Sequence, residues 1–167
     1  MNKIFFILFF IPLFCFSQIK IKTSNYFTDL TFEESRIIIL KGTETPNSGF
    51  YNNHFDKGLY ICKACNNPLF KSKSKFKSTC GWPSFDNEIK GSIIRNPDNS
   101  LGMKRVEICC SNCKGHLGHV FEGEGMTEKN IRHCVNSLSI KFITHNNNTP
   151  LFYIYDNGTP AEKIMIE

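Results

Sequence analysis

The stretch IRHCVNSLSIKF, residues Ile131 to Phe142, predicts a β-strand with a cysteine near its middle. Valine, isoleucine and phenylalanine favour strands, and neither glycine nor proline interrupts the run. Side chains alternate along a strand, so Arg132, Cys134 and Asn136 share one face. A cysteine that only fills the core more often has apolar neighbours. From these residues alone, Cys134 is a core filler, half of a structural disulfide, a metal ligand or a nucleophile.

The remainder of the chain predicts one short helix followed by short strands. Thr31 and Glu34 form the S/T-x-x-E pattern of a capping box, which indicates a helix over about residues 32–40. Regularly spaced strands after a helical lead-in favour a mainly β domain with antiparallel strands. Besides 131–142, the predicted strands cover residues 58–62, 68–70, 92–95, 105–109, 119–122 and 151–155.

The N-terminus has the pattern of a secretory signal peptide. Lys3 precedes an apolar run over 4–16, which has the length of a signal-peptide core and is short for a membrane span. We expect cleavage before Gln18, export to the periplasm or cell exterior, and a single domain over 18–167. The alternative is an anchor that is not cleaved, and membrane contact is expected only in that case.

The basic charge of the chain has one dense patch. The formal net charge is +5, and lysines gather in KSKSKFK, residues 71–77. A basic patch with an aromatic residue can bind nucleic acid. For an exported domain, a solvated loop or an edge strand is the more ordinary interpretation. We therefore expect no nucleic-acid partner.

The cysteine count excludes a framework of disulfides alone. Of eight cysteines, Cys15 falls in the leader, and the remaining seven are an odd number. Two C-x-x-C knuckles supply four thiolates, a set that binds structural zinc in tetrahedral geometry. Two redox or disulfide pairs are the alternative, and His116 also has ligand spacing from Cys113. The expected zinc ligands are Cys62, Cys65, Cys110 and Cys113.

Zinc at the knuckles leaves three cysteines without a role. Cys109 is next to a knuckle cysteine, and we interpret it as a buried filler. Cys80 opens the segment CGWPSF, where glycine and proline enforce a turn around Trp82, the only tryptophan. Cys80 and Cys134 are either a structural disulfide or a working redox couple.

Several motifs in one order resemble a known family. Gly42-Thr-Glu, CGWPSF (80–85), HLGHVF (116–121) and RHCVNS (132–137) occur together with the two knuckles. This combination resembles the B-type peptide methionine sulfoxide reductases, which act on the R epimer, over about residues 30–142. The resemblance implies a fold of two antiparallel sheets and reduction of oxidised methionine in peptides and proteins, a repair of oxidative damage.

The resemblance also implies roles for single residues. Cys134 would be the nucleophile, Cys80 the resolving cysteine and Trp82 the contact for the substrate methyl group. The residues expected around the substrate oxygen and beside the nucleophile are His116, His119, Asn136 and Arg132. A cation beside a thiol raises its thiolate fraction, and histidines can supply a proton near pH 7. Attack at the sulfoxide would leave a sulfenic acid, which a second thiol converts to a disulfide.

Partners and cofactors follow from the same resemblance. The family's reductant is thioredoxin, so an exported member needs an extracytoplasmic thioredoxin-like dithiol. No flavin or nicotinamide fingerprint occurs in the chain. The sequence departs from the family at Gly123, where an aspartate is usual, and Glu122 or Glu124 would have to replace it. The competing hypotheses are a zinc-stabilised binding module and a thiol–disulfide exchange protein.

Overall fold

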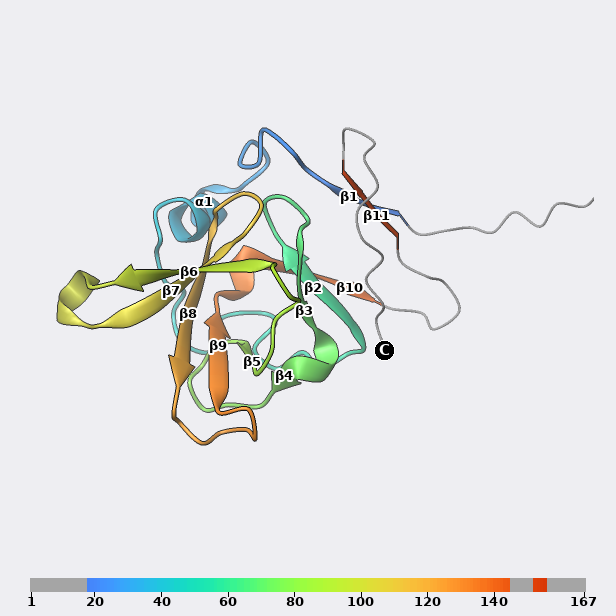
Figure 1. The fold of residues 1–167 in the computed structure, drawn as a ribbon. Helices are drawn as coiled ribbons and strands as arrows, with labels where there is room; N and C mark the ends of the chain where they lie inside the picture. Colours follow the sequence, from blue (N-terminus) through green and yellow to red (C-terminus); the bar gives the residue numbers. More distant parts are fainter. Residues whose placement is uncertain (1–17, 145–151, 156–167) are drawn as a thin grey trace, which may run out of the picture.

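The computed structural model describes residues 18–144 and 152–155 (Figure 1). The predicted leader and most of the C-terminal tail lie outside these residues. Within the described part of the chain, no helix is long and apolar enough to cross a membrane. The mainly β class predicted from the sequence is confirmed.

Two antiparallel sheets form the body of the domain (Figure 1). The six-stranded sheet has the order β4 (Lys75–Phe76), β5 (Ser84–Phe85), β9 (Ile131–Val135), β8 (His116–Glu122), β7 (Arg105–Cys110), β6 (Ile93–Asp98). The three-stranded sheet has the order β10 (Ile140–Thr144), β2 (Gly58–Cys62), β3 (Pro68–Lys71). A separate parallel pair joins β1 (Gln18–Ile21) to β11 (Phe152–Tyr155).

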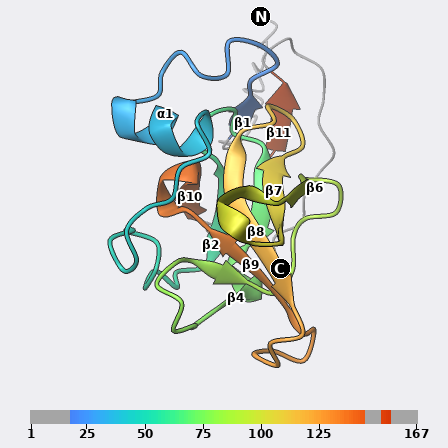
Figure 2. The ribbon, with the colours of Figure 1, turned by 90° about the vertical axis from the view of Figure 1, so that its left-hand side faces the viewer.

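The predicted helix is present as α1 (Phe32–Ile38) and starts at the predicted capping box. The Thr31 hydroxyl accepts from the Glu34 amide at 3.2 Å, and the Glu34 carboxylate accepts from the Thr31 amide at 2.9 Å. The helix lies beside η3 (Ser137–Ser139), a 3-10 turn at one end of the sheets (Figures 1 and 2). The other 3-10 turns are η1 (Ser72–Ser74) and η2 (Ser100–Gly102).

Aromatic side chains from both sheets build the core. Tyr60 and Phe70 come from the three-stranded sheet and Phe85 from the six-stranded sheet, and all three are fully buried. The Phe70 and Phe85 rings stack with their centroids 4.3 Å apart, and Tyr60 meets Phe85 at 5.0 Å. Burying one such side chain stabilises a protein by roughly 1.5–3 kcal/mol. The core therefore fixes the position of β5, and with it the turn that precedes β5.

The prediction of one strand over 131–142 is wrong. The chain leaves the six-stranded sheet after Val135, turns through η3 and joins the three-stranded sheet as β10. The reason is a distant acceptor, because the Glu44 carboxylate binds the amides of Ser137 and Leu138 and holds the turn. The predicted alternation of faces therefore holds only up to Val135, directly after Cys134.

The other predicted strands exist, and most of them have shifted ends. The strand over 58–62 has the predicted bounds, whereas β8 begins three residues earlier than predicted, at His116. The basic patch 71–77 includes β4, which is an edge strand of the six-stranded sheet. Lys75 within it is buried, with its ammonium over the Phe55 ring.

Candidate active site and metal site

Strand pairing brings Cys80 and Cys134 together. Cys134 on β9 lies opposite Ser84 on β5 and His119 on β8. The turn that carries Cys80 runs directly into β5, and the Val135 amide donates to the carbonyl of Pro83 in that turn. The Sγ atoms of Cys80 and Cys134 are 3.8 Å apart, and both residues are partly exposed. A disulfide needs about 2.05 Å between sulfur atoms, so a small shift would close the bond.

Gly118 permits the close approach of β8 and β9 at Cys134. A Cβ atom at this position would lie 2.0 Å from the carbonyl oxygen of Cys134. Any larger residue would therefore push the two strands apart next to the cysteine.

A small cavity of about 110 Å³ opens beside Cys134. Trp82, His119 and Arg105 are among the residues that line it, so its wall contains an aromatic ring, an imidazole and a guanidinium. The volume suits a group of a few heavy atoms rather than a large cofactor. The lining residues are Thr43, Trp82, Arg105, Gly118, His119, Phe121, Cys134, Val135 and Asn136.

The two thiols differ in their pKa values. The Cys134 thiol lowers the pKa of Cys80 to about 4, and the hydroxyls of Ser78 and Ser84, at 3.0 and 3.4 Å, lower it further. The hydrogen bond to Cys80, together with burial, raises the pKa of Cys134. Arg132 acts on Cys134 in the predicted direction, but its effect is smaller than that of Cys80. In the reduced pair, the thiolate therefore lies on Cys80.

This difference predicts how alkylation depends on pH. We expect iodoacetamide to modify Cys80 from about pH 5 upward, because its thiolate is lost only as the pH falls through about 4. The Ser84→Ala variant, which lacks one stabilising hydroxyl, should begin to react at higher pH. Peptide mapping by mass spectrometry locates the modified cysteine. A wild-type onset near pH 8 to 9, as for an ordinary thiol of about pKa 8.5, would contradict the assignment.

A carboxylate supports His119. Asp98, at the end of β6, accepts from His119 Nε2 at 2.8 Å, and the same oxygen accepts from Arg105 at 2.8 Å. Hydrogen bonds from Ser100 are the main cause that lowers the pKa of Asp98, and His119 adds to it. The carboxyl group is therefore ionised at neutral pH. An ionised carboxylate at this distance holds the imidazole in a fixed orientation.

His116 lies deeper than predicted. It is 2% exposed, and its Nδ1 contacts the Glu107 carboxylate at 2.8 Å, while Glu107 also accepts from Lys41 at 2.9 Å. Burial lowers the pKa of His116. The ring packs against that of His119, with centroids 5.5 Å apart, and is not among the residues that line the cavity. Its predicted contact with the substrate oxygen stays a prediction.

Arg132 is held by Glu124 rather than by Glu122. Two hydrogen bonds of 2.7 and 2.8 Å join the guanidinium to the carboxylate, and they raise the pKa of Arg132 and lower that of Glu124. The guanidinium also lies over the Phe121 ring at 4.5 Å. Of the two glutamates considered for the missing aspartate, Glu124 is the one that contacts the predicted active-site arginine.

Asn136 is part of the cavity wall, but its amide is engaged by the backbone. Its Oδ1 accepts from the Glu44 amide at 3.0 Å, and its Nδ2 donates to the Leu117 carbonyl at 3.2 Å. An amide nitrogen carries two hydrogens, so one donor of Asn136 is left for a ligand. Asn136 is 3% exposed, which gives this donor a fixed direction.

The four knuckle cysteines form the predicted cluster. All four are buried, and their sulfur atoms lie within 4.8 Å of one another. Cys62 is 3.6 Å from Cys113, and Cys65 is 3.6 Å from Cys110. Four sulfurs at 2.3 Å around a tetrahedral zinc are separated by about 3.8 Å, so the donor set and its spacing suit such an ion. The cluster joins the end of β2 to the end of β7 and thus links the two sheets.

Several residues of the site are not predicted from the sequence. Asp98, Arg105 and Glu107 contact the site from β6 and β7, and Glu44 contacts it from the loop after α1. The alternation of charged residues in Arg105-Val-Glu107 is the one local signal that they share a face. Asp98 contacts His119 and Glu107 contacts His116 because of the order in which β6, β7 and β8 pair. No pattern of neighbouring residues in the sequence predicts that order.

The fold and the site define a class: a β protein with a redox-capable cysteine pair beside a small cavity and a separate four-cysteine cage that suits a metal ion. The chain belongs to the SelR domain family, whose match covers residues 30–144. This range is close to residues 30–142, over which the sequence resembles the B-type peptide methionine sulfoxide reductases.

Named relatives support this assignment. The chain is 52% identical over 118 residues to "Peptide methionine sulfoxide reductase B2, chloroplastic" of Arabidopsis thaliana, covering 70% of this chain and 57% of that protein. It is 54% identical to "Peptide methionine sulfoxide reductase B5" of Oryza sativa subsp. japonica, covering 68% and 82%. It is 49% identical to "Peptide methionine sulfoxide reductase MsrB" of Teredinibacter turnerae, covering 75% and 94%. The match thus spans little more than half of the first relative.

Proposed function

We propose that this protein reduces methionine-R-sulfoxide in peptides and proteins to methionine and thereby repairs oxidative damage. The proposal rests on one observation above all: Cys134 lies on the wall of the cavity, outside the four-cysteine cage, with the Cys80 sulfur 3.8 Å away. Membership of the SelR family and the names of the relatives support the same activity.

The first step transfers oxygen from the substrate to Cys134. Cys134 releases its thiol proton to solvent as it attacks, and the Arg132 guanidinium favours this loss because it lowers the pKa of Cys134. The Cys134 sulfur attacks the sulfoxide sulfur, and His119, supported by Asp98, protonates the sulfoxide oxygen. The S–O bond of the substrate breaks, and the products are methionine and a sulfenic acid on Cys134.

The second step closes the disulfide. The Cys80 sulfur attacks the sulfenic sulfur, and water leaves with the hydroxyl oxygen. An external thioredoxin-like dithiol then attacks the disulfide and restores two cysteine thiols while it is itself oxidised. Such a dithiol is the required partner, and no flavin or nicotinamide takes part.

Substrate discrimination is assigned to the polar groups rather than to the indole. Contact of a methyl group with Trp82 contributes roughly 1–3 kcal/mol. His119 and Asn136 donate to the sulfoxide oxygen. Reduced methionine would leave these donors unpaired, and this loss of binding free energy is larger than the contribution of the methyl contact. Methionine is therefore a poor inhibitor.

Zinc is the metal proposed for the cage of Cys62, Cys65, Cys110 and Cys113. Four thiolates fill a tetrahedral shell, so such an ion stabilises the fold and leaves no position for substrate. The link between β2 and β7 is the structural reason to assign it this role.

Export remains a proposal that rests on the sequence over residues 1–17. Expression of the full chain followed by N-terminal sequencing of the secreted product tests it. A mature N-terminus at Gln18 is expected, and retention of residues 1–17 in a membrane fraction would favour the anchor.

The activity is tested with separated epimers. The purified protein is incubated with methionine-R-sulfoxide or the S epimer in the presence of dithiothreitol, and released methionine is measured. Release from the R epimer alone is expected. Reduction of protein disulfides without methionine release would favour the exchange protein, and no reaction of either kind would favour the binding module.

Replacement of Asp98 by asparagine tests the proton donor. We expect kcat/KM to fall about 100-fold, at the lower end of the 10²–10⁴ that general acid catalysis contributes. The matched control is Glu88→Gln, since Glu88 contacts His133 at 2.7 Å in a similar pair outside the cavity. Equal losses in both variants would contradict a specific role of Asp98.

A further inference from the structure

We propose that Glu44 is a positioning residue that fixes Trp82 and Asn136 relative to each other in the wall of the cavity. The inference rests on the proposed function, in which these two residues contact the substrate. It concerns the loop between α1 and β2, a part of the chain that supplies neither of the two sulfur atoms.

The backbone of Glu44 contacts both residues directly. Its carbonyl oxygen accepts from the indole Nε1 of Trp82 at 3.2 Å. Its amide donates to Asn136 Oδ1 at 3.0 Å. One peptide segment therefore sets the distance between the ring that contacts the methyl group and the amide that donates to the oxygen.

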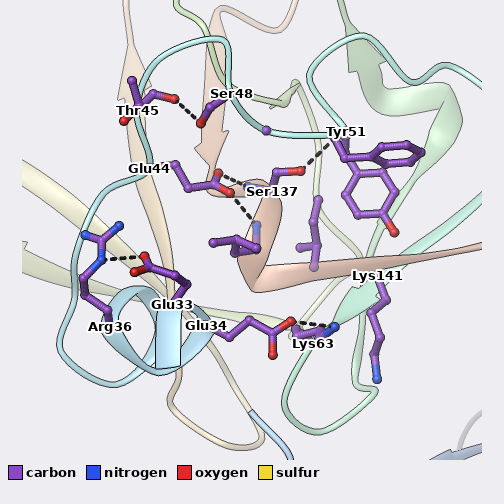
Figure 3. A pocket seen from close by; sticks show the side chains of 14 residues that line it. Glu33, Glu34, Arg36, Glu44, Thr45, Ser48, Tyr51, Lys63, Ser137 and Lys141 are labelled. Atoms are coloured by element: carbon purple, nitrogen blue, oxygen red, sulfur yellow. Dashed lines mark hydrogen bonds and ion pairs between the residues drawn. The ribbon is translucent and has the colours of Figure 1, made fainter. Parts of the chain in front are cut away.

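The side chain of Glu44 fixes this segment to the strand that carries Cys134. Its two carboxylate oxygens accept from the backbone amides of Ser137 and Leu138, the latter at 2.9 Å. Figure 3 shows the carboxylate pointing toward Ser137, whereas Glu33 and Arg36 form a separate ion pair in the same pocket. These two amides belong to η3, directly after Asn136, so the carboxylate links the loop to the end of β9.

Because Glu44 is buried, only a carboxylate suits this position. Glu44 is 7% exposed, and its bonds to the two amides replace the solvation that its charge loses. Burial raises the pKa of Glu44, and the two amides oppose that effect. Glutamine has nearly the same shape but directs an NH₂ group at one of two donors, so at least one amide would lose its acceptor. The loop would then move relative to η3.

We expect a change at Glu44 to alter the position of the bound substrate and not the reactivity of the two thiols. A displacement of about 1 Å in a positioning group can reduce a rate 100-fold. Within the described residues, the hydrogen bonds of Cys80 involve Ser78, Ser84, Trp82 and Cys134, and none involves the Glu44 side chain. Glu44→Gln should therefore lower kcat/KM for the sulfoxide about 10- to 100-fold, while alkylation of Cys80 keeps its pH dependence.

The test compares Glu44→Gln with Glu33→Gln, the same chemical change at an exposed residue that lines the same pocket. Trp82 is the only tryptophan, so its emission and its quenching by iodide report the position of the indole without any turnover. We expect both signals to change in Glu44→Gln and to stay as in the wild type in Glu33→Gln. If the wild type fails to reduce the sulfoxide, the proposed function falls, while the fluorescence still tests the link to Trp82.

A double-mutant cycle separates positioning from general stability. Trp82→Phe keeps an aromatic ring and removes the indole donor to Glu44. If Glu44 acts through Trp82, the loss of kcat/KM in Glu44→Gln with Trp82→Phe is smaller than the product of the single losses. Wild-type kinetics and emission in Glu44→Gln would overturn the proposal. So would a Glu44→Gln protein that does not fold, since Glu44 would then serve the fold itself.

Discussion

Replacement of Cys134 by serine is expected to abolish methionine release, whereas replacement of Cys80 by serine should leave one turnover. A hydroxyl is a far weaker nucleophile at sulfur than a thiolate, so we expect the rate with Cys134→Ser to fall by about 10³-fold or more. With Cys80→Ser, oxygen transfer still produces methionine and a sulfenic acid, but no disulfide forms.

The decisive measurement is methionine released per protein in the absence of reductant. Reduced wild type and Cys80→Ser should each release one equivalent, and Cys134→Ser should release none. With a thioredoxin-like reductant, only the wild type should continue. The two variants are controls for each other, because each removes one sulfur of the same pair. One equivalent from Cys134→Ser would show that another group attacks the substrate.

Loss of the proposed zinc ion is expected to unfold the protein. The apparent binding free energy of structural zinc is about 10–16 kcal/mol, whereas the net stability of a domain is about 5–15 kcal/mol. Cys110→Ser removes one ligand of the cage that joins β2 to β7. We expect this variant, and the wild type treated with a strong chelator, to lose the cooperative thermal transition.

The control is Cys109→Ser, a change at the neighbouring cysteine. Cys109 is also buried, but it is not one of the four cage cysteines. This variant should keep one zinc per chain and a cooperative transition, as measured by metal analysis and circular dichroism. A Cys110→Ser protein that unfolds at the wild-type temperature would contradict the structural role of the cage.

The features that the sequence predicts well are those fixed by local chemistry. The capping box at Thr31 and the two knuckles each depend on residues a few positions apart, and the structure contains them where expected. The sequence does not predict the break of the strand after Val135, because the cause of the break is remote. The carboxylate that accepts from Ser137 and Leu138 comes from Glu44, more than ninety positions away.

The residues of the candidate site also fall into two groups, those that sequence motifs identify and those that only strand pairing brings to the site. The resemblance names Cys80, Trp82, His119 and Cys134. The last three line one cavity, and the Cys80 sulfur lies 3.8 Å from that of Cys134. Asp98 was missed because its contact with His119 arises from the order of β6, β7 and β8 in the sheet. The resemblance names His116 as well, but His116 is 2% exposed and is not among the residues that line the cavity.

The short distance between the two sulfurs has a consequence for survival under peroxide. A sulfenic acid that persists can be oxidised further to sulfinic acid, which thioredoxin-type dithiols do not reverse. The Cys80 sulfur lies 3.8 Å from that of Cys134, so disulfide formation needs no rearrangement of a loop. Under the proposed mechanism, the sulfenic acid on Cys134 is therefore short-lived. The geometry therefore favours an enzyme that keeps working while the oxidant that damages its substrates is still present.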